Sequence, residues 1–145
     1  MQNRLSSSLE DYLEAAYTLA GATGQVKPCA ISRLLRVSKP SVNAAMKALA
    51  ARGLLSQERY GAVSLSPAGR KAGAEIAARH ALLKDFFVEV LATPAALAER
   101  DACRAEHALS PEALGRVGAL ALFLKAPGRR ALLQAARKAL AGRKA

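Results

Sequence analysis

Residues 28–53 read PCAISRLLRVSKPSVNAAMKALAARG, and this stretch decides the fold. Pro28 opens a short helix, and Ser38 followed by Pro40 opens a second helix, because Ser favours the N-cap and Pro favours the first turn. Gly53 ends the second helix. The apolar residues of that helix recur at helical spacing and define one face: Val42, Ala45, Met46 and Leu49. The stretch therefore predicts two short helices joined by a tight turn.

The segments on either side of this pair predict a further helix and a hairpin. Ser8, with an acid three residues later, indicates a helix start, and Gly21 ends that helix. Residues 54–58 and 62–65 are expected to form two short strands around Arg59-Tyr60-Gly61. The order helix, helix, turn, helix and hairpin is that of a winged helix-turn-helix with a small two-stranded wing.

The rest of the chain is predicted to be helical. Ser66-Pro67 begins a long helix that is expected to run to about Leu91. Thr93-Pro94 and Ser110-Pro111 repeat the same start signal, and Pro127 is expected to begin a last, basic helix. The fold class is therefore mainly α.

Length and composition limit the class of protein. The chain has 145 residues, of which 52% are hydrophobic and 23% charged, so it is globular and too short for a large multidomain enzyme. Two cysteines do not make a disulfide framework, which favours a reducing compartment. The N-terminus lacks an apolar targeting segment, and no stretch reaches the ~18 apolar residues of a membrane-spanning helix. We expect a cytoplasmic protein without a membrane partner.

The net charge of +11 is concentrated in two blocks. Residues 15–57 contain six cations and no acid, and residues 125–145 contain seven cations and no acid. Such segregation favours a polyanion, with nucleic acid ahead of a membrane surface because large aromatic anchors do not flank the blocks. The alternative is a solvated basic surface, although such a surface normally mixes both signs of charge.

In a winged helix-turn-helix, the second helix of the pair enters the major groove of DNA. Here that helix carries Ser and Asn side chains that can hydrogen-bond base edges, and Lys side chains that can hold phosphate. The hairpin tip is placed to touch the flanking backbone. The residues expected to contact DNA are Arg33, Arg36, Ser38, Lys39, Pro40, Ser41, Asn43, Lys47, Arg59 and Tyr60.

A second group of residues has the chemistry of a metal site. Cys103, Glu106 and His107 stand at i, i+3 and i+4, which places a thiol, a carboxylate and an imidazole on one helical face. Asp11 and Glu14, at i and i+3, offer two more oxygen ligands. Taken singly, each residue has an ordinary structural explanation, such as a capping acid, a small buried thiol or a core histidine.

Four stretches together resemble a known family: SLEDYLEAAYTL (8–19), VSKPSV (37–42), RHALL (79–83) and DACRAEHALS (101–110). They are similar to the metal-dependent transcriptional repressors named for the diphtheria toxin repressor, which include the manganese transport repressor. The resemblance runs from Leu9 to about Leu124. It implies a winged helix-turn-helix domain over residues 1–70 and a helical dimerisation and metal-binding domain over 71–125. A basic C-terminal helix or tail, 126–145, stands where longer members have an SH3-like domain.

The resemblance also implies a set of metal ligands. Five residues match the manganese branch: Asp11, Glu14, His80, Glu106 and His107. Cys103 stands where that branch commonly has Glu and the iron branch has Cys, so the expected site is a hybrid. An ancillary site of the iron branch would involve His80, Lys84 and Glu99, and the cation at its middle position makes its usual form doubtful.

The expected function is that of a homodimeric repressor that binds a palindromic operator in double-stranded DNA and controls metal-homeostasis genes. Hard oxygen ligands favour Mn(II), and the thiolate favours Fe(II) as the next choice. Co(II), Ni(II) or Zn(II) would also bind in vitro. The alternatives are a metal-independent winged-helix regulator and a basic architectural DNA-binding protein. An enzyme is not expected, because the chain lacks an HExxH motif, a nucleophile elbow and a phosphate-binding glycine loop.

Overall fold

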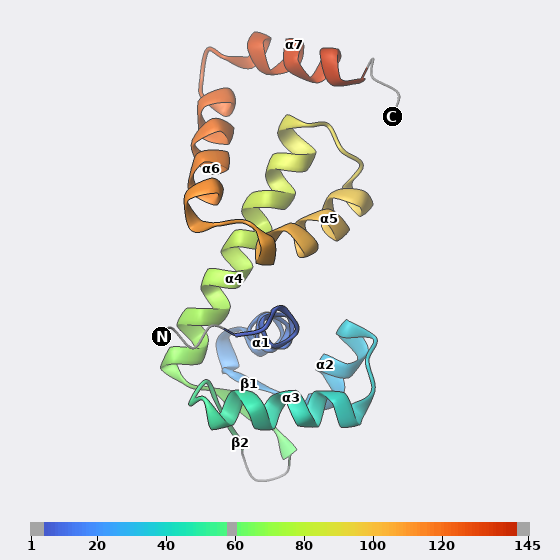
Figure 1. Cartoon of the computed structure of the whole chain (residues 1–145), viewed down its shortest axis with the longest axis vertical. Coiled ribbons are helices and arrows are strands. Elements are labelled where there is room, and N and C mark those ends of the chain that lie inside the picture. The colour runs from blue at the N-terminus through green and yellow to red at the C-terminus, as the bar shows by residue number, and fades with distance from the viewer. Residues whose placement is uncertain (1–4, 58–60, 142–145) are drawn as a thin grey trace. The chain divides into compact units, whose positions relative to one another are not determined.

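The structure is a computed structural model that describes residues 5–57 and 61–141. It divides into two compact units, Met1–Ala77 and Ala78–Ala145. Helices dominate both units, and the only sheet among the described residues is small and antiparallel (Figure 1). The predicted fold class, mainly α with a winged helix-turn-helix at the N-terminus, is confirmed.

The first unit begins with three helices. Their bounds are α1 Ser7–Ala20, α2 Pro28–Leu35 and α3 Lys39–Ala51, with a single 3-10 turn, η1 (Gly21–Thr23), after α1. Ser38 caps α3 as predicted, since its Oγ accepts the N–H of Ser41 at 3.2 Å. The predicted cap of α1 is wrong by two residues. Ser6, not Ser8, accepts the N–H of Leu9, at 3.3 Å.

The sheet of the first unit has one strand more than the sequence predicted. Its strands are β1 Gln25–Val26, β2 Leu55–Gln57 and β3 Val63–Leu65, in the order β1-β3-β2. Val63 of β3 pairs with Val26 on one side and with Gln57 on the other. A strand of two residues is too short to show the alternation of apolar and polar residues by which strands are recognised.

A mostly aliphatic core holds the first unit together. All three helices, the sheet and the first half of α4 (Pro67–Asp85) contribute to it. Its most deeply buried members are Leu13, Ala16, Ile31, Val42, Met46, Leu49 and Val63. The apolar face predicted for α3 is this buried face. Because α3 packs through one side only, its opposite side is left to solvent.

The second unit is entirely helical over its described residues. After the second half of α4 come a π-helical turn η3 (Phe86–Val90), α5 (Ala95–Ala108), α6 (Pro111–Lys125) and α7 (Arg130–Ala141). Leu83, Ala102 and Leu114 form its small core. The predicted long helix is α-helical only to Asp85. The predicted start of the last helix at Pro127 is also wrong, since α7 begins at Arg130.

The start of α4 packs closely against the segment before β2, and this contact depends on a glycine. Ser66 donates its N–H to the Leu54 carbonyl and its hydroxyl to the Gly53 carbonyl, and its Oγ accepts the N–H of Gly69. These bonds bring the backbone of Leu54 so close that a Cβ on Gly69 would collide with its carbonyl oxygen. Backbone cannot move aside as a side chain can.

We therefore expect Gly69→Ala to lower the free energy of unfolding by about 1–3 kcal/mol, the usual effect of overpacking. Ala68→Ser is the matched control. It also adds one heavy atom to the first turn of α4, but at an exposed position, and should change stability by less than about 0.5 kcal/mol. Urea unfolding at one protein concentration measures both. Equal midpoints for Gly69→Ala and the unsubstituted protein would contradict the prediction.

Candidate DNA interface and metal centre

The exposed side of α3 carries the residues predicted to read DNA. Pro40, Asn43 and Lys47 lie on one exposed face, opposite the buried Val42 and Met46. The hydroxyls of Ser38 and Ser41 lie 2.8 Å apart at the start of the helix. The face thus presents an amide, hydroxyls and an ammonium from a rigid helix, a combination suited to base edges and phosphates.

The turn between α2 and α3 is fixed by Arg36. This residue adopts the left-handed conformation, with φ 54°, and donates its N–H to the Ser32 carbonyl. Val37 donates its N–H to the same carbonyl, and the Ser32 hydroxyl donates to the Val37 carbonyl at 2.7 Å. These three bonds close the turn and determine how α3 leaves α2. Glycine is the usual residue for a left-handed turn position because it adopts a positive φ without strain. Arg36 occupies this position instead and so adds a positive charge to the turn.

All the predicted DNA-contacting residues that the structure describes are exposed. They are Arg33, Arg36, Ser38, Lys39, Pro40, Ser41, Asn43 and Lys47. The other two, Arg59 and Tyr60, lie outside the described residues. Because residues 15–57 contain no acid, the cations of α2, the turn and α3 have no anionic neighbour in their own segment.

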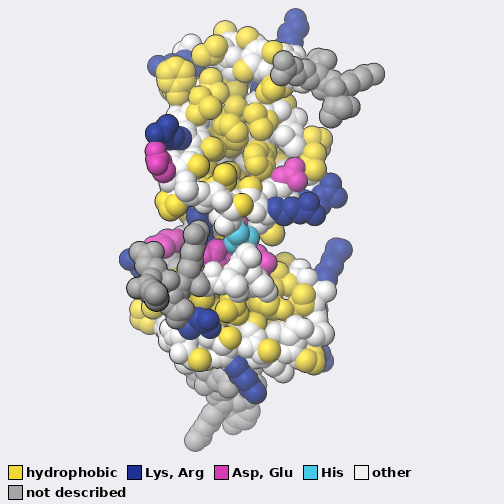
Figure 2. All heavy atoms as spheres, viewed as in Figure 1, with side chains coloured by type: hydrophobic (Ala, Val, Ile, Leu, Met, Phe, Trp, Pro, Cys, Tyr) yellow, Lys and Arg dark blue, Asp and Glu magenta, His cyan; other side chains and the backbone are white. Residues whose placement is uncertain are grey.

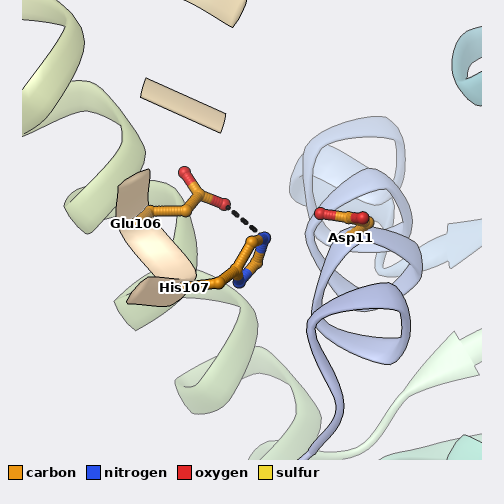
Figure 3. Close-up of side chains that lie close together, drawn as sticks. All are labelled: Asp11, Glu106 and His107. Carbon is orange, nitrogen blue, oxygen red and sulfur yellow. Dashed lines mark ion pairs between the residues drawn. The ribbon is translucent and has the colours of Figure 1, made fainter. Parts of the chain in front are cut away.

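The candidate metal centre of the second unit is built around Glu106. The Glu106 side chain is 0% exposed, an unusual position for a carboxylate unless it is paired or binds a metal. Its Oε2 lies 2.7 Å from His80 Nδ1, and its Oε1 lies 3.3 Å from His107 Nε2. The two imidazoles are 16% and 12% exposed. Figure 3 shows the Glu106–His107 pair on α5.

These three residues have the donor chemistry of a transition-metal site. Two imidazole nitrogens face the two oxygens of one buried carboxylate, and imidazole and carboxylate suit first-row divalent ions from manganese to zinc. His80 comes from α4, whereas Glu106 and His107 come from α5. The donor set therefore fits a metal ion.

The other predicted ligands lie elsewhere. Asp11 and Glu14 are half-buried on α1 of the first unit, three residues apart and so on one face of that helix. Figure 3 also draws Asp11 on α1. Cys103 is exposed on α5, one turn before Glu106. Within the second unit the structure thus brings together His80, Glu106 and His107.

The structure also shows a further partner of His80, Glu99, which residue chemistry alone did not reveal. His80 Nε2 lies 3.1 Å from Glu99 Oε1, and Lys84 Nζ lies 2.6 Å from Glu99 Oε2. The hydrogen bond and charge of Glu99 raise the pKa of Lys84. The hydrogen bond from Lys84 lowers the pKa of Glu99, more than partial burial raises it. Glu99 is therefore held as a carboxylate beside a charged ammonium.

The fold and the donor cluster together are typical of transcription regulators that join a winged helix to a helical metal-binding domain. Two family models match the chain: "Iron dependent repressor, N-terminal DNA binding domain" over residues 4–63, and "Iron dependent repressor, metal binding and dimerisation domain" over residues 66–128. The chain belongs to this family of metal-dependent transcriptional repressors.

Relatives of known sequence agree with this assignment. An uncharacterized HTH-type transcriptional regulator of Methanocaldococcus jannaschii is 32% identical, over 78% of this chain and 91% of its own length. The HTH-type transcriptional regulator MntR of Geobacillus kaustophilus is 33% identical, over 85% of this chain and 86% of its own. These relatives are transcriptional regulators, not enzymes.

Solved structures share the fold. A manganese-dependent transcriptional repressor in complex with manganese is 28% identical with a TM-score of 0.71, over 79% of this chain and 53% of that chain. ScaR with bound Zn²⁺ is 29% identical with a TM-score of 0.64, over 77% of this chain and 52% of that chain. This chain spans about half the length of those solved chains. Among the described residues, no helix is both long and apolar enough to cross a membrane.

Proposed function

We propose that this protein is a homodimeric repressor that binds a palindromic operator when a divalent metal, Mn(II) first and Fe(II) next, is bound. The observation that carries the proposal is the buried Glu106 carboxylate, which both His80 and His107 contact. Burying a carboxylate costs free energy, and a bound cation would offset that cost. We place the protein in the cytoplasm and its targets among metal-homeostasis genes.

The proposed ligands are the residues named from the sequence. His80, Glu106 and His107 form the part supported by contacts within one unit. Asp11 and Glu14 would add hard oxygen donors, and their spacing on one face of α1 supports this role. Cys103 would add a thiolate from the turn of α5 before Glu106. A bound ion would supply a positive charge that offsets the negative charges of the carboxylate and thiolate ligands.

The choice of Mn(II) over Fe(II) rests on ligand hardness and on relatives. Carboxylate oxygens suit Mn(II), whereas a thiolate favours softer ions. Relatives that are 31–33% identical carry the name MntR, and one solved relative is a manganese-dependent repressor in complex with manganese. The ScaR structures contain Zn²⁺ or Cd²⁺, so related sites accept other divalent ions as well.

A homodimer is supported by the apolar surface of the second unit. Figure 2 shows hydrophobic side chains over much of the visible face of this unit, in the upper part of the view. Several large apolar side chains are exposed: Leu91, Leu97, Leu120, Leu122, Phe123, Leu132 and Leu140. Exposed apolar surface of this extent is typical of protein interfaces. A symmetric dimer would present two copies of α3 to two half-sites, so we expect the operator to be palindromic.

Metal and DNA are proposed to favour the same conformation of the dimer. If metal tightens DNA binding by a given factor, DNA must tighten metal binding by the same factor. This reciprocity gives a direct test of the mechanism. It separates the proposed repressor from a metal-independent winged-helix regulator, in which the two affinities would be unrelated.

The decisive experiment is DNA binding by chelator-stripped protein under anaerobic conditions. Binding is measured without metal, with Mn(II) and with Fe(II). Each condition is tested on two DNAs, the promoter region of the gene that encodes this protein and a random duplex. We expect specific binding to appear only with metal, and more strongly with Mn(II) at equal free concentration. Equal binding with and without metal would overturn the proposal, and equal binding to both DNAs would indicate an architectural protein.

Asn43 should contribute to sequence reading without affecting metal. We expect Asn43→Ala to weaken operator binding by about 1–3 kcal/mol, the usual contribution of a good amide contact to a base, while metal affinity in the absence of DNA stays unchanged. Gln25→Ala, which removes an exposed amide from β1, is the matched control. Titrations of operator and of metal measure the two affinities. A shift of the metal titration in Asn43→Ala would contradict the assignment.

Lys39 should contribute through phosphate instead. We expect Lys39→Ala to weaken binding to operator and random DNA alike, and to reduce the slope of log affinity against log salt by about 1. Selective loss of operator binding in this variant would show that Lys39 reads a base.

A further inference from the structure

We propose that Glu99, held by Lys84, is the positioning residue that orients His80 toward the metal. The inference rests on the proposed function, and it concerns the chain of contacts Lys84–Glu99–His80–Glu106 between α4 and α5. All four residues belong to the second unit. Neither Lys84 nor Glu99 is proposed to touch the metal.

The geometry links the four side chains in one line. His80 and Lys84 are four residues apart on α4 and therefore lie on the same face of that helix. Glu99, on α5, bridges them, with Oε2 2.6 Å from Lys84 Nζ and Oε1 3.1 Å from His80 Nε2. The other ring nitrogen of His80, Nδ1, lies 2.7 Å from Glu106 Oε2. The two ring nitrogens thus face two different carboxylates.

The two nitrogens are suited to different tasks. Nδ1 faces the buried Glu106 and so is the nitrogen presented to the metal. Nε2 faces the half-exposed Glu99 at 3.1 Å, and in the tautomer that leaves Nδ1 free for a metal, the N–H of Nε2 donates to that carboxylate. A histidine that binds a metal commonly donates its second ring N–H to a carboxylate, which fixes the ring orientation and makes the ligating nitrogen more basic. Glu99 occupies this position.

Lys84 explains how an exposed carboxylate keeps its place. The Glu99 side chain is 52% exposed, and an unrestrained Glu in that position would sample several rotamers. The Lys84 ammonium contacts Oε2 and leaves Oε1 directed at His80. A lysine is suited to this task because its cation is part of the chain and always present. No second metal ion is needed to hold Glu99.

The test compares metal affinities of variants in the full-length protein. Glu99→Gln keeps the shape of the side chain and removes its charge, and Lys84→Met removes the cation that holds it. Lys84→Arg restores a cation at the same position. The matched control is Glu112→Gln, because Glu112 pairs with Arg116 at 2.7 Å in an exposed ion pair on α6. Affinities for Mn(II) and Co(II) are measured by competition with a chelator.

We expect Glu99→Gln to weaken metal binding by about 10-fold, within the range typical of lost outer partners of a metal ligand. Lys84→Met should weaken it less, Lys84→Arg should match the unsubstituted protein, and Glu112→Gln should have no effect. The visible absorption of bound Co(II) should change in Glu99→Gln, because the orientation and basicity of His80 change. If the ion pair between Lys84 and Glu99 is purely structural, variants with unchanged thermal stability should show the same Co(II) spectrum and metal affinity as the unsubstituted protein.

Each negative result has a distinct meaning. If Glu99→Gln and Lys84→Met bind metal as tightly as Glu112→Gln and give the same Co(II) spectrum, the positioning role is overturned. His80→Ala separates this failure from a failure of the proposed function. If His80→Ala also binds metal normally, His80 is not a ligand and the proposed metal site itself is wrong.

Discussion

Glu106→Gln is expected to abolish the response of DNA binding to metal. The substitution keeps the size of the side chain but replaces a buried carboxylate, whose two oxygens face His80 and His107, with an amide. The amide has no charge to offer a cation, and its NH₂ group cannot act as a ligand. At metal concentrations that saturate the unsubstituted protein, operator affinity should therefore stay at its metal-free value. The expected loss is the whole coupling between metal and DNA, typically about 5- to 150-fold.

The measurement is an operator titration with and without Mn(II), together with the oligomeric state and a thermal melt of the metal-free protein. His107→Ala should give the same result by removing a nitrogen donor. Glu112→Gln, at an exposed position, is the control and should respond normally to metal. A normal metal response in either Glu106→Gln or His107→Ala, with the dimer intact, would remove these residues from the site.

DNA affinity is expected to fall by ~10³-fold or more between 50 and 200 mM salt, if six or more phosphates are contacted. The reason is the basic stretch around α2 and α3, where six cations occur without an acid. Each phosphate contact releases a condensed counterion, so the logarithm of the affinity falls linearly with the logarithm of the salt concentration. The slope therefore counts the contacts.

The titration is repeated with operator and random DNA at fixed free metal. Lys47→Gln, which neutralises an exposed cation of α3, should reduce the slope by about 1 on both duplexes. Arg116→Gln, on α6 of the second unit, is the control for loss of a cation elsewhere. A flat dependence on salt would refute DNA binding through this basic surface.

Features of the fold that depend on a few neighbouring residues could be predicted from the sequence. The starts of α3 and α6 follow from Ser followed by Pro, since the hydroxyls of Ser38 and Ser110 cap these helices as expected. For α1 the sequence predicts a cap at Ser8, whereas Ser6 makes the bond, because three consecutive serines offer the same hydroxyl. Strand β1 was missed because its two residues are held by pairing with β3, a contact distant in sequence.

The same distinction applies to the candidate site. Glu106 and His107 adjoin on one helix, so their chemistry was visible in the sequence. His80 joins them through tertiary packing of α4 on α5, and only the resemblance to a family suggested it. The bridge from Lys84 through Glu99 to His80 spans two helices, and no spacing rule for a single helix predicts it. Cys103 has the right spacing for a ligand, yet it is exposed where Glu106 is buried.

If the buried Glu106 binds metal as proposed, metal supply also affects the lifetime of the protein. A ligand that binds only the folded state stabilises it, by about 2.7 kcal/mol at a free concentration of one hundred times its dissociation constant. Proteases act on the small unfolded fraction, and at this metal concentration that fraction falls about 100-fold. Cells rich in metal would therefore hold more repressor as well as more active repressor. When metal becomes scarce, degradation of the destabilised chains would lower the amount of repressor and so reinforce derepression.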